Sequence, residues 1–191
     1  AYKGKSAILI AAGPSLKKQL PKLKEAQNNH ILIAAGQTVK TLHANGIHPH
    51  FVVAADPQDA LQKYFDSDAY TREVLLCLTV CSSEVVSKFP GHKVFFQYTP
   101  KIDEALNASI GHMGSVRLGG SVANVAYSLA RYFGIDDIAL IGQDLAFTNG
   151  ESHTDGYVGK KIRTDDEMAK NHRYRKVPGY YGDMLYTNRQ M

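Results

Sequence analysis

Near its start the sequence reads Ala7-Ile8-Leu9-Ile10-Ala11-Ala12-Gly13-Pro14-Ser15-Leu16, an aliphatic run that breaks at a Gly-Pro-Ser corner. A short aliphatic run with β-branched members is typical of a buried strand, and Gly13 lets the backbone turn sharply. Pro14 suits the first turn of a following helix, where Ser15 adds a hydroxyl beside unpaired amides. Because such a corner can bind an anion, it predicts a doubly wound α/β fold that holds a nucleotide or another phosphate compound.

The composition is that of an ordinary soluble domain. Hydrophobic residues make up 44% of the 191 residues and charged residues 21%, and the length is enough for one domain with a proper core. The 22 Lys and Arg against 18 Asp and Glu leave a formal net charge of only +4. The basic residues gather only between Lys170 and Lys176, which suits a phosphate or sugar acid better than a duplex. We therefore expect no nucleic-acid partner.

Cysteine usage and hydropathy predict a cytoplasmic protein. Cys77 and Cys81 lie in one apolar run without a second Cys or His pair to complete a metal site, so we interpret them as reduced thiols. The sequence has neither an apolar run near the roughly 20 residues of a membrane span nor a recognisable signal segment. Since it begins without Met and ends at Met191 with no closing element, we expect a domain of a longer chain.

Apolar runs alternate with helical or polar stretches, which predicts βαβ units and a Rossmann-like, mostly parallel sheet. The clearest helix is predicted over 121–133, where apolar residues recur at helical spacing and stop at Gly134. A weaker helix over 16–27 is expected to break at Pro21. Further helices are predicted over 38–45 and 58–65, and strands over 6–12, 30–35, 51–55, 74–79, 93–98 and 137–141.

The sequence changes character at Thr148. Polar residues, Gly and Tyr dominate from there to Met191, and aliphatic residues become sparse. We therefore predict a ligand-binding core over 1–147 and a loop-rich C-terminal lid of the same domain over 148–191.

Candidate binding residues come from the strand exits, because ligands of open parallel sheets sit outside the carboxyl ends of the strands. These candidates are Gly13, Pro14, Ser15, Gln37, Asp56, Gln143 and Asp144. Gly120 and Ser121 precede the helix over 121–133, where free amides could hold a phosphate or Ser121 could only cap the helix. The other candidates have structural alternatives too, since the Gly13 corner could be a plain turn and the carboxylates could only stabilise turns.

Histidine is the side chain whose ordinary pKa best suits a general base for a hydroxyl acceptor. His153 follows Asp144 closely enough to share its cleft, and His172 is the substitute candidate; the competing interpretation is an exposed bystander. His30, His43, His48, His50 and His92 border predicted elements and are expected at the surface or at edges. No metal is expected, because the Asp66-Ser67-Asp68 pair lies in a polar linker and not at a strand exit.

Several motifs follow one another in order along nearly the whole chain. They are Ala12-Gly13-Pro14-Ser15-Leu16, the approach from Gly46 to Asp56, Gly119-Gly120-Ser121-Val122-Ala123, the block from Gly134 to Thr148, His153, and Val177-Pro178-Gly179-Tyr180-Tyr181-Gly182. The most specific is Gly142-Gln143-Asp144-Leu145-Ala146. Together they resemble the motility-associated factor family of flagellin glycosyltransferases. More distantly the pattern is similar to bacterial CMP-sialic acid sialyltransferases, although Ala12 and Gly36 stand where those enzymes carry Asn.

This resemblance implies a metal-independent, inverting glycosyltransferase. It would move a nonulosonic acid, of the pseudaminic, legionaminic or sialic acid type, from a CMP-sugar donor to Ser or Thr of flagellin, with no other cofactor. Gln37 and Asp56 would then lie near the base and ribose, and Gly120 and Ser121 near the phosphate. His153 would take the acceptor proton, and Tyr180 or Tyr181 would donate a hydrogen bond to the leaving phosphate.

Two other functions stay open. The same superfamily also looks to include archaeal-type 6-hydroxymethylpterin pyrophosphokinases, which share the Gly-Pro-Ser-Leu corner. Such an enzyme would need Mg²⁺ to bridge nucleotide phosphates. The third possibility is a non-catalytic module that recognises a glycan or nucleotide-sugar and recruits flagellin.

Overall fold

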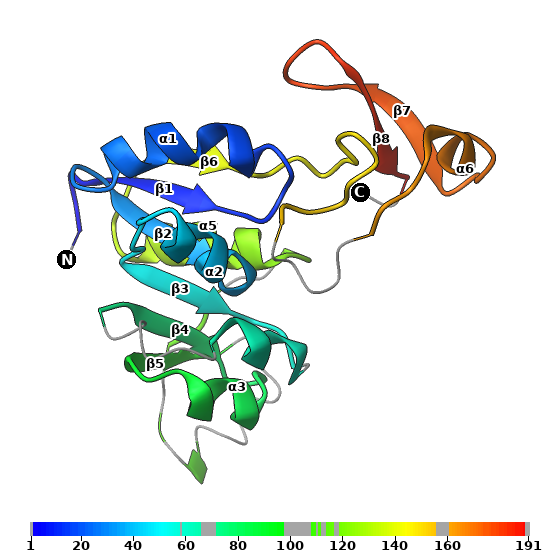
Figure 1. Ribbon diagram of the computed structural model, residues 1–191. Helices are drawn as coiled ribbons and strands as arrows, with labels where there is room; N and C mark the ends of the chain where they lie inside the picture. Colours follow the sequence, from blue (N-terminus) through cyan, green and yellow to red (C-terminus); the bar gives the residue numbers. More distant parts are fainter. Residues whose placement is uncertain are drawn as a thin grey trace.

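The computed structural model describes residues 2–57, 59–65, 72–97, 108–109, 111, 114–116, 119–155 and 161–189. At its centre lies a six-stranded, fully parallel sheet with the order β5-β4-β3-β2-β1-β6 (Figure 1). The strands are β1 (Ser6–Ile10), β2 (Ile31–Ala35), β3 (Phe51–Ala54), β4 (Val74–Leu78), β5 (His92–Phe96) and β6 (Asp137–Ile141). The predicted Rossmann-like α/β fold with a mostly parallel sheet is thus confirmed.

The strand order places a topological switch point between β1 and β6. The chain adds β2 to β5 outward from β1, and α5 (Val122–Tyr132) then leads back to β6 on the other side of β1. Strands β1 and β6 pair with Ile10 opposite Ile141, so the two strands end side by side at the carboxyl edge of the sheet. A crevice at such a point is where open α/β sheets bind ligands.

Helices cover both faces of the sheet because successive strand residues alternate between faces. On one face, Val125 and Leu129 of α5 pack against a buried cluster that includes Leu9. On the other, α1 (Leu16–Ala26) and α2 (Val39–Ala44) bury apolar side chains against the alternate strand residues, such as Ile8 and Leu32. The short helices η1 (Gly36–Thr38), η2 (Asp59–Tyr64) and α3 (Ser83–Lys88) complete this layer.

The expected break of the first helix at Pro21 is wrong, because α1 runs through Pro21 to Ala26. Leu16 and Leu23 are fully buried on either side of the proline and anchor both halves of the helix to the sheet. Pro21 itself is exposed. Burial of the two leucines, about 1.5–3 kcal/mol each, offsets the roughly 3 kcal/mol that an interior proline costs.

The tail after Thr148 contains three regular elements besides its loops. Helix α6 (Asp165–Ala169) begins with a capping box between Thr164 and Glu167, and β7 (Tyr174–Pro178) pairs with β8 (Met184–Asn188) in an antiparallel hairpin. The tail lies beyond the carboxyl ends of the sheet strands (Figure 1). The Phe147 amide donates to the Tyr186 carbonyl at 2.7 Å and the Thr154 amide to Ala12 at 2.8 Å, so hydrogen bonds tie it to the core.

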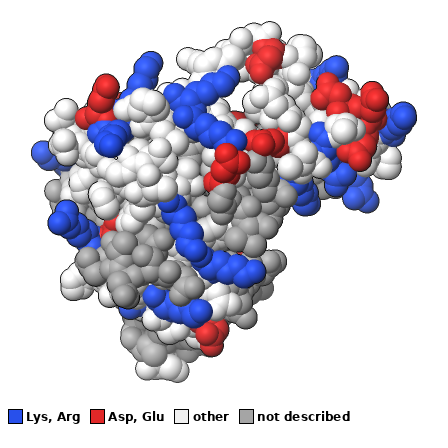
Figure 2. Space-filling model, in the orientation of Figure 1, with Lys and Arg blue, Asp and Glu red and all other residues white. Residues whose placement is uncertain are grey.

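The surface has charges of both signs. Figure 2 shows Lys and Arg spread over the described part of the viewed face, with a group of Asp and Glu at α6 and further acidic residues elsewhere on this face. Among the described helices, none combines the length and apolar character that crossing a membrane requires.

Candidate functional site

Two strand exits are joined at the switch point by a carboxylate clamp. Asp144, just after β6, accepts a hydrogen bond from the Ser15 backbone amide at 2.7 Å and another from the Ser15 hydroxyl. The Gly13 amide donates to the Gly142 carbonyl at 2.8 Å. A negative charge beside the first amides of α1 also interacts favourably with the helix dipole. The sequence-predicted residues Gly13, Ser15 and Asp144 therefore come together, and they bind one another.

Glycine is required on both sides of this clamp. A Cβ on Gly13 would collide with the Gly142 carbonyl oxygen and lie 2.6 Å from Asp144 Oδ1. Gly142 has φ +70°, and a Cβ there would collide with the Ala11 carbonyl oxygen. The close approach of the two backbones, rather than ligand contact, explains these glycines.

The Gly-Pro-Ser corner differs from the expected anion site. Pro14 has no amide hydrogen, and every backbone N–H from Gly13 to Lys18 has an acceptor within the protein. The Asp144 carboxylate accepts from the Ser15 amide at this corner. Negative charge from a ligand would meet Asp144 there, so the corner is poorly suited to an anion.

Removing the clamp's charge should destabilise the fold. Asp144→Asn is expected to lower the free energy of unfolding by about 1–3 kcal/mol, because the amide cannot accept both hydrogen bonds from Ser15. Chemical denaturation measures this difference. Asp137→Asn, at an exposed position on β6, the strand that precedes Asp144, is the matched control and should change the free energy by less than about 0.5 kcal/mol. Equal effects of the two substitutions would contradict a stabilising role for the clamp.

A cavity of about 470 Å³ opens at the carboxyl edge of the sheet. It is lined by the exits of β1, β2 and β6, by the start of α5, and by tail residues including His153, Lys161 and Tyr174. Of the sequence-predicted site residues it contains Gly13, Gln37, Ser121, Gln143, Asp144 and His153. Its volume is within the range of small-molecule sites. The two Gly-containing turns thus share one crevice.

The start of α5 brings unpaired backbone amides to this crevice. Ser121 is the N-cap, and its hydroxyl accepts from the Asn124 amide. The next two residues, Val122 and Ala123, line the cavity, and their backbone N–H groups have no acceptor among the described residues. Gly120 makes the turn into the helix with φ +60°. These amides and the positive end of the α5 dipole form the part of the crevice suited to an anion.

His153 is held in the crevice by the tail crossing over the exit of β1. The Thr154 amide donates to the Ala12 carbonyl, and Lys17 contacts Asp155 at 2.8 Å on the outer side. His153 Nδ1 lies 2.9 Å from the Ser152 hydroxyl. Burial, and after it the positive charge of Lys161, lowers the pKa of His153 below its ordinary value of 6.5. At neutral pH the imidazole is therefore uncharged and able to accept a proton.

The charge of Lys161 gives His153 a testable pH dependence. Lys161→Met should raise the pKa of His153, because it removes a cation that disfavours the imidazolium. The rate of any step that needs neutral His153 rises with pH as the imidazolium loses its proton. The acidic limb of the pH–rate profile should therefore move to higher pH in the variant. NMR titration of the His153 ring protons measures the shift, with Lys170→Met as the control. An unchanged or lowered pKa would contradict the electrostatic contact.

Gln143 contributes an unsatisfied group. Its Nε2 atom is buried and has no hydrogen-bond acceptor among the described residues, and the buried hydroxyl of Thr154 is in the same situation. An unmade buried hydrogen bond costs about 1–3 kcal/mol. Leu145, two residues further, has φ +50° although it is not glycine. Unsatisfied and strained groups concentrate at functional sites, which supports the crevice as the site.

The predicted site residues that do not line this cavity are Pro14, Ser15, Asp56, Gly120, His172, Tyr180 and Tyr181. His172 is exposed between α6 and β7, and Asp56 lies beside Cys81 at the exit of β3. Tyr180 and Tyr181, at the tip of the β7–β8 hairpin, line a second cavity of about 420 Å³ with Ser15. The Tyr181 hydroxyl accepts from Gln19 at 2.8 Å, so Tyr181 fastens the hairpin to α1 instead of reaching the α5 amides. The Asp66-Ser67-Asp68 pair is outside the described residues.

The two cysteines are not reactive groups. Burial raises the pKa of Cys77 to about 12 and that of Cys81 to about 11, which keeps both thiols protonated at neutral pH. Cys81 donates to the Ala54 carbonyl at 3.0 Å. Neither thiol is part of a disulfide.

The fold and the switch-point crevice define the chain as a Rossmann-like α/β domain with a small-molecule-sized cavity between β1, β6 and α5. Residues 1–150 match the family described as 6-hydroxymethylpterin diphosphokinase MptE-like, and the chain belongs to that family. No curated protein matches it significantly.

A solved structure shares the fold. The MAf glycosyltransferase from Magnetospirillum magneticum AMB-1 superposes with a TM-score of 0.75 over 98% of this chain, at 19% sequence identity. The chain spans 28% of that protein. The predicted resemblance to the motility-associated factor family is thus confirmed for the fold.

Proposed function

We propose that this chain is the nucleotide-sugar-binding domain of a glycosyltransferase. It would transfer a nonulosonic acid from a CMP donor to a Ser or Thr hydroxyl of flagellin, in the cytoplasm and without a metal. The observation that carries the proposal is the single crevice that combines unpaired α5 amides with an uncharged, half-buried His153. The fold shared with a MAf glycosyltransferase and the sequence motifs listed above support the same class.

The donor phosphate belongs at the start of α5. The amides of Val122 and Ala123 and the Lys161 ammonium are the positive groups of the cavity. Gln37 from the exit of β2 is then placed for the ribose or base, and the Nε2 of Gln143 for a sugar oxygen. This assignment moves the phosphate from the Gly-Pro-Ser corner, whose backbone N–H groups are all bonded, to the start of α5, which lines the crevice.

The reaction needs one proton acceptor and stabilisation of one leaving group. The acceptor hydroxyl attacks the anomeric carbon of the sugar, and the bond from that carbon to the CMP phosphate oxygen breaks. His153 takes the hydroxyl proton, and the oxyanion of CMP leaves against the α5 amides and Lys161. If Nδ1 of His153 donates to Ser152, Nε2 carries the lone pair for this step. Attack opposite the leaving group inverts the anomeric configuration.

The second candidate is a 6-hydroxymethylpterin diphosphokinase. The match of residues 1–150 to a family of that description favours it. Such an enzyme bridges nucleotide phosphates with Mg²⁺ held by oxygen ligands. Among the described residues that line the crevice, Asp144 is the one carboxylate, and both its oxygens accept hydrogen bonds from Ser15. Metal binding there would have to break the clamp.

Calorimetry separates the two enzymes. We expect CMP to bind in EDTA, with affinity unchanged by Mg²⁺, and ATP with Mg²⁺ to bind more weakly or not at all. Tight binding of ATP that depends on Mg²⁺, with none of CMP, would overturn the glycosyltransferase proposal in favour of the kinase. Mass spectrometry of co-expressed flagellin then tests catalysis. CMP-sugar binding without modified flagellin would indicate a non-catalytic module.

A further inference from the structure

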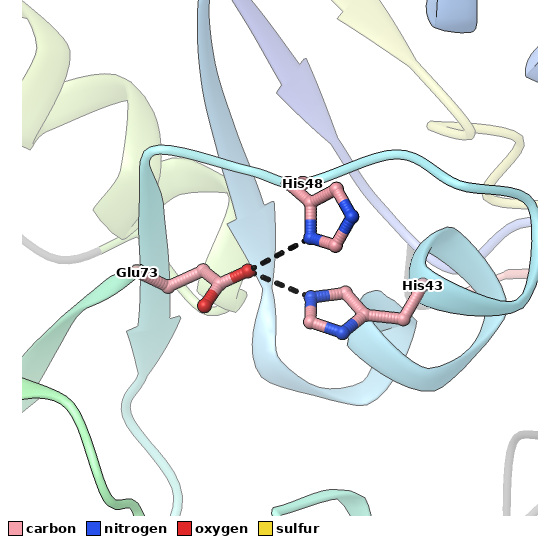
Figure 3. A group of neighbouring side chains, drawn as sticks. All are labelled: His43, His48 and Glu73. Atoms are coloured by element: carbon pink, nitrogen blue, oxygen red, sulfur yellow. Dashed lines mark hydrogen bonds and ion pairs between the residues drawn. The ribbon is translucent and has the colours of Figure 1, made fainter. Parts of the chain in front are cut away.

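Three potential metal ligands meet at the amino edge of the sheet, opposite the crevice. His43 comes from the last turn of α2, His48 from the loop before β3, and Glu73 directly precedes β4 (Figure 3). Glu73 Oε1 lies 2.7 Å from His43 Nε2 and 3.5 Å from His48 Nδ1. The three ligand atoms lie within 4.8 Å of one another. The sequence had placed both histidines at the surface or at edges, yet the side chain of His43 is only 12% exposed.

The burial of this cluster is unusual for a simple ion pair. The Glu73 side chain is 0% exposed, and both imidazoles approach the same carboxylate oxygen. Their ring centroids are 4.7 Å apart, so two imidazolium ions would repel each other. A buried carboxylate requires a compensating charge. One divalent cation between the three groups supplies that charge.

We propose that His43 Nε2, His48 Nδ1 and Glu73 Oε1 bind a divalent transition-metal ion, with Zn²⁺ the best match. Two imidazoles and one carboxylate are a common zinc ligand set, and bonds of about 2.0–2.2 Å in a tetrahedron put neighbouring ligand atoms about 3.3–3.5 Å apart. Glu73 Oε1 and His48 Nδ1, which are 3.5 Å apart, already have this spacing. Glu73 Oε1 and His43 Nε2 are hydrogen-bonded at 2.7 Å and must move apart by about 0.6–0.8 Å as the imidazole proton leaves. His48 is 47% exposed, so the fourth position faces solvent and takes water.

Neighbouring groups hold the ligands in place. The Arg72 amide donates to the other carboxylate oxygen of Glu73 at 3.2 Å, and the His48 amide donates to the Gln27 side chain at 3.2 Å. Such second contacts orient ligands before the ion arrives. The site joins α2, the approach to β3 and the start of β4, so the bound ion stabilises the fold and takes no part in the crevice chemistry. The proposal is therefore independent of the proposed function.

Zinc titration of the EDTA-treated, dialysed chain tests the site. We expect calorimetry to show one Zn²⁺ per chain, Mg²⁺ to give no signal, and Zn²⁺ to raise the midpoint of thermal unfolding by mass action. His48→Ala and Glu73→Gln should each weaken Zn²⁺ binding at least about 100-fold, since even indirect contacts to ligands affect affinity 10–100-fold. His48→Ala truncates a half-exposed side chain, so it tests the site even if Glu73→Gln unfolds.

His92→Ala is the matched control, because His92 is exposed at the amino end of β5 on the same edge of the sheet. It should bind Zn²⁺ like the unaltered chain. Co²⁺ in place of Zn²⁺ should give the visible absorption of a tetrahedral site, lost in His48→Ala. Absence of Zn²⁺ binding to the unaltered chain would overturn the proposal, as would His48→Ala binding as tightly as His92→Ala.

Discussion

His153→Ala is expected to lower the rate constant for sugar transfer by about 10²–10⁴-fold, the usual contribution of a general base. The affinity for CMP should stay within a few-fold, because the phosphate is held by the α5 amides and Lys161. The pKa of His153 lies below its ordinary value through burial and the nearby Lys161, so the unaltered protein should keep its activity down to mildly acidic pH. Single-turnover assays with CMP-sugar, together with CMP calorimetry, measure both quantities.

His172→Ala separates the two histidine candidates in the same assay. His172 is exposed between α6 and β7 and does not line the crevice, so this variant should transfer at the unaltered rate. Full activity of His153→Ala with loss in His172→Ala would reverse the assignment. Loss of CMP binding in His153→Ala would instead indicate that His153 contacts the nucleotide.

Gly142→Ala should cause the largest loss of stability, about 3–5 kcal/mol. Its φ of +70° already disfavours a side chain, and the new Cβ would collide with the Ala11 carbonyl, a backbone atom held by the β1–β6 pairing. Gly182→Ala is the matched control. It has φ +83° but nothing within 4 Å of its Cβ, so only the conformational cost of about 1–2 kcal/mol remains. Denaturant titration measures both; equal losses would show that close packing at the clamp contributes nothing.

The strands of the sheet could be predicted because each is a short aliphatic run buried between two helical layers. The prediction for β6 matches the structure at both ends, and those for the other strands differ by one or two residues. Strand order could not be predicted, since it depends on α5 crossing back to the far side of β1. The hairpin of β7 and β8 was missed because its two strands are short and mix polar with apolar residues without a clear alternation, although Tyr186 and Thr187 are buried.

The meeting of Gly13 with Asp144 was predictable, because parallel strands end at one edge of the sheet. Their role could not be predicted, because only the structure shows that the Asp144 carboxylate accepts a hydrogen bond from the Ser15 amide. Lys161 and Tyr174 were missed as crevice residues. They come from a polar tail without periodicity. Backbone contacts with Ser152 hold Lys161 at the crevice, and a ring contact with Phe147 holds Tyr174 there. The His43, His48 and Glu73 cluster likewise depends on three separate segments.

The position of bound CMP is the most direct test of the account. A crystal structure of the chain with CMP should show the nucleotide in the crevice between β1, β6 and α5. Its phosphate should accept hydrogen bonds from the Val122 and Ala123 amides, with the Asp144–Ser15 clamp intact. CMP in the second cavity beside Tyr181, or a phosphate that displaces Asp144 from Ser15, would contradict it.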